Sequence, residues 1–151
     1  MSTNESLQSQ YIKQYLDVHL HRDLNLSLQS QHIDKLTTRV IMSDQLIGNP
    51  YTHIIHGGYL AAALDASAGL CASLSVFNKQ YELTLEAMTA LITDISTTNL
   101  QVNYLRPGTG QYFDIESETL RSGRRLTVVE SRCLDDQNRL IATCSAQFVT
   151  G

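Results

Sequence analysis

The stretch HGGYLAAALDASAGLCASLSVF, residues 56–77, decides the fold. Apolar residues would fall on every face of a helix with this sequence, which predicts a helix that is buried all round. Its many alanines allow neighbouring backbones to approach closely. A sheet must therefore wrap around this segment to cover it. The one charged residue between Leu60 and Phe77 is Asp65.

Alternation of apolar and polar residues on both sides of the helix predicts the strands of that sheet. The expected strands are Leu24–Leu28, Leu36–Met42, and residues 97–106, 111–120, 124–134 and 139–149. Turn residues such as Pro107-Gly108 separate the last four strands, which predicts an antiparallel meander. The expected fold class is α+β, with a curled antiparallel sheet of five to six strands around one long central helix.

Two shorter helices are expected at the edges of this core. Apolar residues recur at helical spacing over Ser9–His21, so residues 1–21 form a predicted N-terminal helical extension. Tyr81–Leu91 has a similar spacing and predicts a second short helix. A length of 151 residues with 42% hydrophobic content suits a single domain, 1–151, with one core.

The charge balance argues against nucleic-acid and membrane partners. The chain has 11 Lys+Arg against 15 Asp+Glu, and a nucleic-acid binder needs clustered basic residues to neutralise phosphates. The one dense basic cluster, Arg121, Arg124 and Arg125, suits a single small anion. The N-terminus is polar, and no apolar run approaches about 18 residues. We therefore expect a cytoplasmic protein with no nucleic-acid and no membrane partner.

The cysteines and histidines form no metal-binding or disulfide pattern. None of the cysteines has CxxC spacing, and their number is odd: they are Cys71, Cys133 and Cys144. His53 and His56 are three residues apart, but no Cys, Asp or Glu cluster completes a site. His19 and His21 are two residues apart and so would not share a helix face. We expect no metal and no cofactor.

Asp65 and the Gly57-Gly58 pair are the features that carry chemistry. A carboxylate in a buried helix is costly unless it is paired or functional. The first N–H groups of a helix lack internal partners and carry partial positive charge. Because glycines leave these amides uncovered, the Gly57 N–H could hold the oxyanion that develops on a carbonyl. Two plainer interpretations stay open: Asp65 lies at the rim of the helix or binds backbone or threonine hydroxyls, and the glycines only permit a tight turn into the helix.

The spacing of these groups predicts how they could combine. Asp65 follows Gly57 by eight residues, which is about 12 Å along a helix axis. One chain cannot place both groups on one carbonyl, because a carboxylate side chain reaches only a few ångströms. If the two groups act together, they must come from two subunits that lie antiparallel, and a two-fold dimer supplies two such sites.

Three stretches resemble a known family. HGGYLAAALDASAGLCA, with Asp65 nine positions after His56, resembles the HGG motif of hot-dog-fold acyl-CoA thioesterases of the phenylacetate-pathway (PaaI-like) group. NLQVNYLRPG resembles the strand of that group that ends in LRPG, and SGRRLTVVESRCLDDQNRLIATCSAQF resembles its last two strands. The resemblance covers about Leu24–Val149. It implies a hot-dog fold, an acyl-CoA substrate hydrolysed without a cofactor, and a homodimer or a dimer of dimers.

The resemblance also implies catalytic roles. Gly57 would donate its N–H to the thioester oxygen, and Asp65 would be the nucleophile or the general base that activates water. His56 would help to hold the loop and the thioester. Thr97, or Thr98 if the register differs by one, would orient the acid or the water.

Further positions are implied to bind the substrate. They are Asn49, Gly58, Arg106, Gly123, Arg124 and Arg125. Asn49 lies seven residues before His56, where the family has six. The SGRR turn and nearby Arg106 would face the phosphates of CoA, since a nucleotide anion binds arginine forks or backbone amides. The alternative for the two arginines of that turn is an ordinary solvated strand edge. Segment 78–95 is longer than the family's usual link, and we expect the Tyr81–Leu91 insertion within it to lie over the acyl tunnel or at the dimer rim.

Two other functions stay open. A protein of the same fold could bind acyl-CoA without catalysis, and it would then be stabilised by the ligand without turnover. A hydratase or dehydratase needs a His–acid pair at a double bond, and it ranks last because His56 is far along the helix from Asp65.

Overall fold

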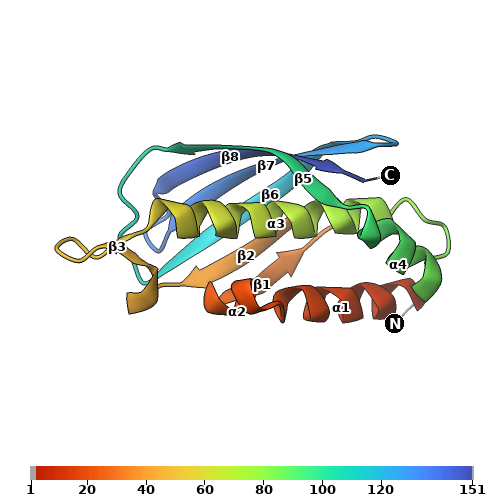
Figure 1. Ribbon diagram of the computed structural model, residues 1–151, viewed down its shortest axis with the longest axis horizontal. Coiled ribbons are helices and arrows are strands. Elements are labelled where there is room, and N and C mark those ends of the chain that lie inside the picture. The colour runs from red at the N-terminus through yellow and green to blue at the C-terminus, as the bar shows by residue number, and fades with distance from the viewer. Residues whose placement is uncertain (1–2, 151) are drawn as a thin grey trace.

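The long helix α3 (Gly57–Phe77) lies along one face of a six-stranded antiparallel sheet in a computed structural model of the protein, which describes residues 3–150 (Figure 1). In sheet order, the strands are β1 (Leu26–Gln31), β2 (Lys35–Ile41), β6 (Tyr112–Ser122), β7 (Leu126–Asp135), β8 (Leu140–Val149) and β5 (Ser96–Tyr104). The other elements are α1 (Thr3–Leu16), α2 (His19–Asp23), the short 3-10 helix η1 (Asp44–Leu46), the ribbon of β3 (Ile47–Asn49) and β4 (Ile54–Ile55), and α4 (Leu85–Thr93). The expected α+β architecture around one central helix is confirmed.

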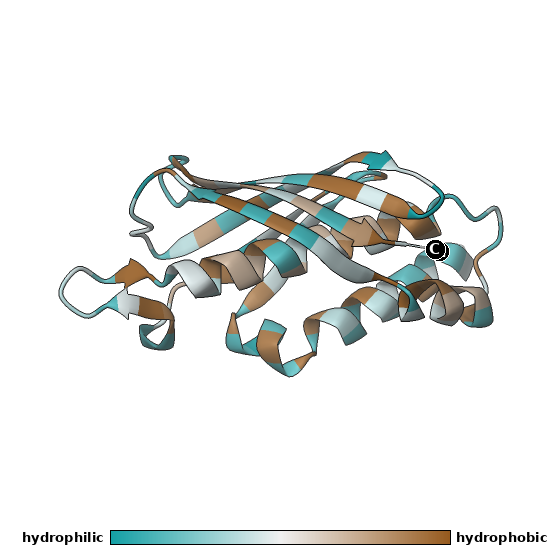
Figure 2. Ribbon diagram, turned by 45° about the horizontal axis from the view of Figure 1, so that its top comes forward, coloured by the Kyte–Doolittle hydropathy of each residue, from teal (hydrophilic) through white to brown (hydrophobic). Residues whose placement is uncertain are grey.

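Helix α3 supplies the centre of the core. Leu64 and Leu70 are fully buried and belong to one apolar cluster with Phe113 and Ile115 of β6. Hydrophobic and hydrophilic residues alternate along the strands (Figure 2), so each strand turns one set of side chains towards the helix. Among residues 3–150, α3 is the one helix that is long and apolar enough to cross a membrane, and 83% of its apolar window is buried inside the fold. Its place under the sheet accounts for its apolar composition.

The N-terminal extension differs from the prediction of one helix over Ser9–His21. Helix α1 begins at Thr3, so the polar start of the chain is helical from that residue on, and the chain breaks near Val18 before α2 begins. The spacing of the apolar residues does not predict this break between α1 and α2. Packing on α3 holds α1 in place, because the Tyr11 hydroxyl donates to Ser73 Oγ at 2.9 Å and most helical stability comes from tertiary packing.

The predicted meander is correct for β6, β7 and β8 and wrong for β5. Strand β5 pairs with β8 at the far edge of the sheet, and β6 pairs with β2 instead. The reason is that α3 and α4 carry the chain past the inner strands before β5 begins (Figure 1). The outer edge of β5 is unpaired within the described chain, and it exposes Leu100 and Tyr104.

Candidate active site

The Asp65 carboxylate lies where α3 passes the first residues of β5. Its Oδ1 accepts a hydrogen bond from Thr97 Oγ1 at 3.0 Å. The register of β5 against β8 shifts between Thr97 and Asn99, and Thr98 Oγ1 donates instead to the carbonyl of Gln147 at 3.2 Å. Of the two threonines named from the sequence, the structure therefore brings Thr97 to Asp65.

Asp65 lines a pocket of about 280 Å³. The pocket lies between α3, the N-terminal extension and the start of β5, and its wall includes Tyr11, Tyr15, His21, Ile92, Ile95 and Phe148. Ile92 and Ile95 belong to segment 78–95, so the C-terminal end of that segment lies beside Asp65. The plainer interpretation, in which Asp65 binds a threonine hydroxyl, agrees with the hydrogen bond from Thr97. The carboxylate also lines a cavity, which leaves it accessible to a ligand.

The environment of Asp65 suits a base. Burial raises the pKa of its carboxyl above the usual range, while the hydrogen bond from Thr97 and the attraction of His21 act in the opposite direction. A general base works best when its pKa is near the operating pH, so an upward shift improves a carboxylate in this role. Burial, with a contribution from the Asp65 charge, also raises the pKa of the neighbouring Cys144 thiol to about 12, which keeps that thiol protonated and inert.

His21 is a residue of this pocket that the sequence did not reveal. Its Nδ1 lies 2.6 Å from the carbonyl oxygen of Tyr15. A carbonyl can only accept, so Nδ1 carries the proton and Nε2 is the other nitrogen available to the pocket. The ring also packs on Tyr15, with centroids 4.5 Å apart. The spacing of His19 and His21 indicates only that the two residues do not share a helix face. The sequence around them carries no signal that α2 packs beside Asp65.

Gly57 and Gly58 lie at the other end of the site, in the first turn of α3. His56 is the N-cap, and its Nδ1 accepts from the Gly58 N–H at 2.9 Å. The Gly58 amide is therefore already used, and a side chain there would begin 3.0 Å from the His56 ring. Within residues 3–150, no hydrogen bond uses the Gly57 N–H, which leaves this donor for a ligand.

A second pocket, of about 420 Å³, opens beside Gly57. Tyr104, Leu105 and Arg106 line it together with Gly57. The Tyr104 hydroxyl donates to the Gly57 carbonyl, and a Cβ on Gly57 would meet the tyrosine ring at 3.3 Å. Tyr104 thus fixes the backbone that carries the free amide, a role that the LRPG strand did not reveal.

The Asp65 pocket and the Gly57 pocket have no lining residue in common. Eight residues of regular helix separate the two groups, or about 12 Å along the axis. The structure therefore keeps the carboxylate and the free amide of one chain apart, as their spacing in the sequence predicts.

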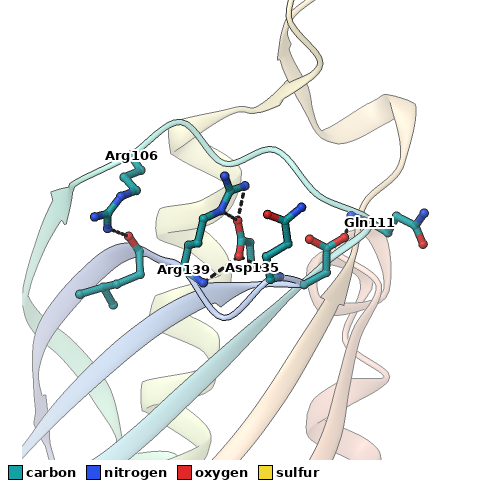
Figure 3. Close-up of polar contacts among 7 residues, drawn as sticks. Arg106, Gln111, Asp135 and Arg139 are labelled. Atoms are coloured by element: carbon teal, nitrogen blue, oxygen red, sulfur yellow. Dashed lines mark hydrogen bonds and ion pairs between the residues drawn. The ribbon is translucent and has the colours of Figure 1, made fainter.

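The basic residues lie at opposite ends of the sheet, which corrects the expectation that Arg106 is near the SGRR turn. Tyr104 pairs with Ala142, whereas Leu126 pairs with Val149. Ala142 and Val149 are seven residue steps apart, which is about 24 Å of strand. Arg106 instead lies near Arg139 (Figure 3).

The Arg106 end of the sheet is held by hydrogen bonds and an ion pair. The guanidinium of Arg106 donates to the Leu140 carbonyl at 2.8 Å, and Arg139 binds the buried Asp135 carboxylate at 2.7 Å (Figure 3). Arg106 is exposed and is the basic residue among those that line the Gly57 pocket.

The remaining predicted substrate-binding residues lie outside both pockets. The Asn49 side chain accepts from the Tyr51 N–H at 3.0 Å and so closes the turn between β3 and β4. Gly123 lies in the turn between β6 and β7, where its N–H donates to Leu126. Arg124 and Arg125 are exposed in the same turn, which places them at the Thr97 end of the sheet.

A family model described as the acyl-CoA thioesterase N-terminal domain matches residues 48–149, more than half of the chain. The chain belongs to this family. This thioesterase is therefore a thioester hydrolase with a hot-dog fold, and both expectations drawn from the sequence are confirmed.

Individual relatives agree with the family. The medium/long-chain acyl-CoA thioesterase YigI of Salmonella typhimurium is 28% identical over 135 residues, which cover 88% of this chain and 87% of that protein. A crystal structure from Shewanella oneidensis, related to the thioesterase superfamily, has a TM-score of 0.92 at 28% identity and covers 98% of this chain and 97% of that chain. A candidate thioesterase from Syntrophus aciditrophicus has a TM-score of 0.86 at 29% identity, with coverage of 99% and 100%.

Proposed function

We propose that this thioesterase hydrolyses acyl-CoA to a free acid and CoA at sites shared by two copies of the chain. In each site, Asp65 of one copy serves as the base or nucleophile, and the Gly57 amide of the other copy holds the oxyanion. The observation that carries the proposal is that the carboxylate and the free amide of one chain lie in separate pockets.

The unpaired edge of β5 supports this assembly. A two-fold contact is self-complementary, and an exposed strand edge pairs readily with another strand. If two copies of β5 pair antiparallel about Leu100, Ser96 of each copy lies opposite Tyr104 of the other. That pairing brings the Asp65 pocket of one copy beside the Gly57 pocket of the other, because Ser96 lines the first pocket and Tyr104 lines the second.

The same pairing reunites the basic residues. Arg106 follows β5 at one end, whereas the Arg124-Arg125 turn lies two strands from the other end of β5. In an antiparallel dimer, Arg106 of one copy and the arginine turn of the other copy therefore lie at the same end. Together they form a cationic rim for the phosphates of CoA.

The chemistry needs only groups of the protein and one water, without a cofactor. As a general base, Asp65 accepts a proton from the water while the water oxygen bonds to the thioester carbon. The Gly57 N–H stabilises the resulting oxyanion. When the tetrahedral intermediate collapses, the C–S bond breaks and the proton passes from Asp65 to the CoA sulfur. In the alternative route, the Asp65 carboxylate attacks the thioester carbon and forms an anhydride as the C–S bond breaks and CoA leaves as its thiolate. Water then cleaves the anhydride to the free acid and the Asp65 carboxylate, and the released proton passes to the thiolate. Thr97 orients the carboxylate in both routes.

Two finer assignments accompany this proposal. The HGG stretch with its spaced Asp65 supports membership of the PaaI-like group. The cysteines Cys71, Cys133 and Cys144 are free and buried, which suits a reducing compartment and supports a cytoplasmic enzyme.

The decisive test is Asp65→Asn, assayed on a panel of acyl-CoA esters. We expect a loss of about 10²–10⁴-fold in kcat, because the base is removed while the shape of the side chain is kept. Asp44→Asn, at an exposed carboxylate of η1, is the matched control and should retain activity. Full activity of Asp65→Asn would contradict the proposed role, and stabilisation of the wild type by acyl-CoA without any turnover would favour an acyl-CoA-binding protein instead.

A further inference from the structure

The N-terminal extension lies outside the segment that matches the family, residues 48–149, yet it forms one wall of the Asp65 pocket. Tyr11 and Tyr15 of α1, and Leu20 and His21 of α2, all line that pocket. The shape of the pocket therefore depends on a part of the chain that the shared family segment does not supply.

The opposite wall is a face of α3 with small side chains. Ala62, Ala66, Gly69 and Ser73 follow one another at helical spacing and line the pocket with Asp65. Tyr15 covers this face, because its hydroxyl donates to the Ala66 carbonyl at 2.8 Å. A Cβ on Gly69 would lie 2.8 Å from the same hydroxyl, so the glycine is what allows the tyrosine to approach.

Of the α3 residues that line the pocket, Ser73 lies farthest along the helix from Asp65, and Tyr11 contacts it there. The Tyr11 hydroxyl donates to Ser73 Oγ at 2.9 Å, and Ser73 donates in turn to the Gly69 carbonyl at 2.9 Å. Behind them, the Tyr11 ring packs edge-on against Phe77 with centroids 5.0 Å apart. Because the hydroxyls at this end are bonded to each other, the end wall is suited to the methyl terminus of an apolar chain.

The depth of the pocket follows from the helix. Ser73 lies eight residues after Asp65 on α3, or about 12 Å along the axis. An extended carbon chain with bonds of about 1.5 Å advances about 1.25 Å per bond, so about ten carbons fill this depth. The volume of about 280 Å³ is also near the lower end for ligand pockets, about 300–1,000 Å³.

We propose that Tyr11 of the N-terminal extension determines acyl-chain specificity by closing the acyl pocket about ten carbons from the carbonyl that meets Asp65, while Tyr15 forms a side wall nearer to Asp65. This inference rests on the proposed function. It assigns the extension a role in substrate selection, with Ile92, Ile95 and Phe148 as the apolar side wall.

The test compares kcat/KM over saturated acyl-CoA esters from butyryl to stearoyl in wild type and two opposite variants. We expect the wild type to peak near the decanoyl ester. Tyr11→Ala removes the end wall and should raise the stearoyl-to-decanoyl ratio by about tenfold or more, whereas Ser73→Val fills the end and should lower the ratio of decanoyl to butyryl activity by about tenfold. Since the variants act in opposite directions, either one alone tests the proposal if the other does not fold.

Tyr81→Ala is the matched control, because Tyr81 is fully exposed and outside the pocket; it should keep the wild-type profile. Calorimetry then measures binding of the same esters to the Asp65→Asn variant and to the Asp65→Asn, Tyr11→Ala double variant. Because binding does not require turnover, this measurement tests the acyl pocket separately from the proposed function. Absence of hydrolysis by the wild type would reject the proposed function alone. A chain-length profile that is the same in the folded variants and the wild type, in both turnover and binding, would overturn the role of the extension.

Discussion

The Gly57 end and the Asp65 end of helix α3 present opposite kinds of chemistry. At Gly57 the backbone is the functional group, and His56 and Tyr104 hold it from two sides. At Asp65 the side chain is the functional group, and its surroundings come from distant segments, including Thr97 and His21. Under the proposed function, the two ends of this helix are half-sites, and a second copy of the chain completes each of them.

The largest effect should come from separating the half-sites. Leu100 is exposed on the unpaired edge of β5, and Leu100→Lys places a charge in the proposed strand pairing. We expect a folded monomer in sedimentation velocity and a loss of activity of more than about 10³-fold, since base and oxyanion donor no longer meet. Leu120→Lys, at an exposed leucine of β6, is the control. A fully active monomer would show that one chain holds a complete site.

Removing the backbone donor tests the Gly57 end alone. Proline is favourable at the first helical position and lacks an N–H, and the preceding His56 is extended, with ψ of 130°, as a residue before proline requires. Gly57→Pro should therefore fold and lose about 10²–10³-fold in kcat. Gly57→Ala keeps the N–H and crowds only the Tyr104 ring, so it should lose less. Equal losses in the two variants would indicate packing as the cause.

Combining the two kinds of defect tests whether each site takes Asp65 from one chain and Gly57 from the other. A dimer of one Asp65→Asn chain and one Gly57→Pro chain has one site with both defects and one intact site. Random co-assembly should therefore restore activity to about one quarter of the wild-type value, because about half of the dimers are mixed and each has one of its two sites. Activity that stays at the level of the single variants after subunit exchange would place the complete site within one chain.

The smallest effect concerns the charge environment at Asp65. Burial raises the pKa of Asp65, and His21 opposes that shift. His21→Asn removes the opposing attraction, so the pKa rises further and the acid limb of the kcat/KM profile moves to higher pH, because the base must be ionised. Activity well above that limb should change less than about tenfold, since the base remains. His19→Asn, exposed on the same helix, should leave the limb in place, and an unmoved limb in His21→Asn would contradict the interaction.

Sequence periodicity predicted the parts of the fold that depend on residues close together in the chain. The apolar helix around Asp65 and the alternating strands follow from side-chain spacing, and both are present in the structure. The place of β5 was missed, because strand order depends on where α3 and α4 deliver the chain. The start of α1 at Thr3 was missed because its contacts, such as Tyr11 with Ser73, join residues far apart in the sequence.

The candidate site divides in the same way. Asp65, Gly57 and their separation were read from the sequence, because helix geometry converts residue number into distance. The choice of Thr97 over Thr98 needed the structure, since it depends on which face of β5 meets α3. The positions of Arg106 and of the Arg124-Arg125 turn also needed the structure, because strand pairing decides which strand ends lie at the same edge of the sheet.

Composition and the rise per residue are local properties, and they are enough to predict a buried central helix whose acid and first-turn amide are too far apart to share one carbonyl. The surroundings of each group come instead from the packing of the folded chain. It brought Tyr15 and His21 of the extension to Asp65, and Tyr104 to Gly57. These neighbours are set by packing between segments tens of residues apart, for which the local sequence carries no periodic signal.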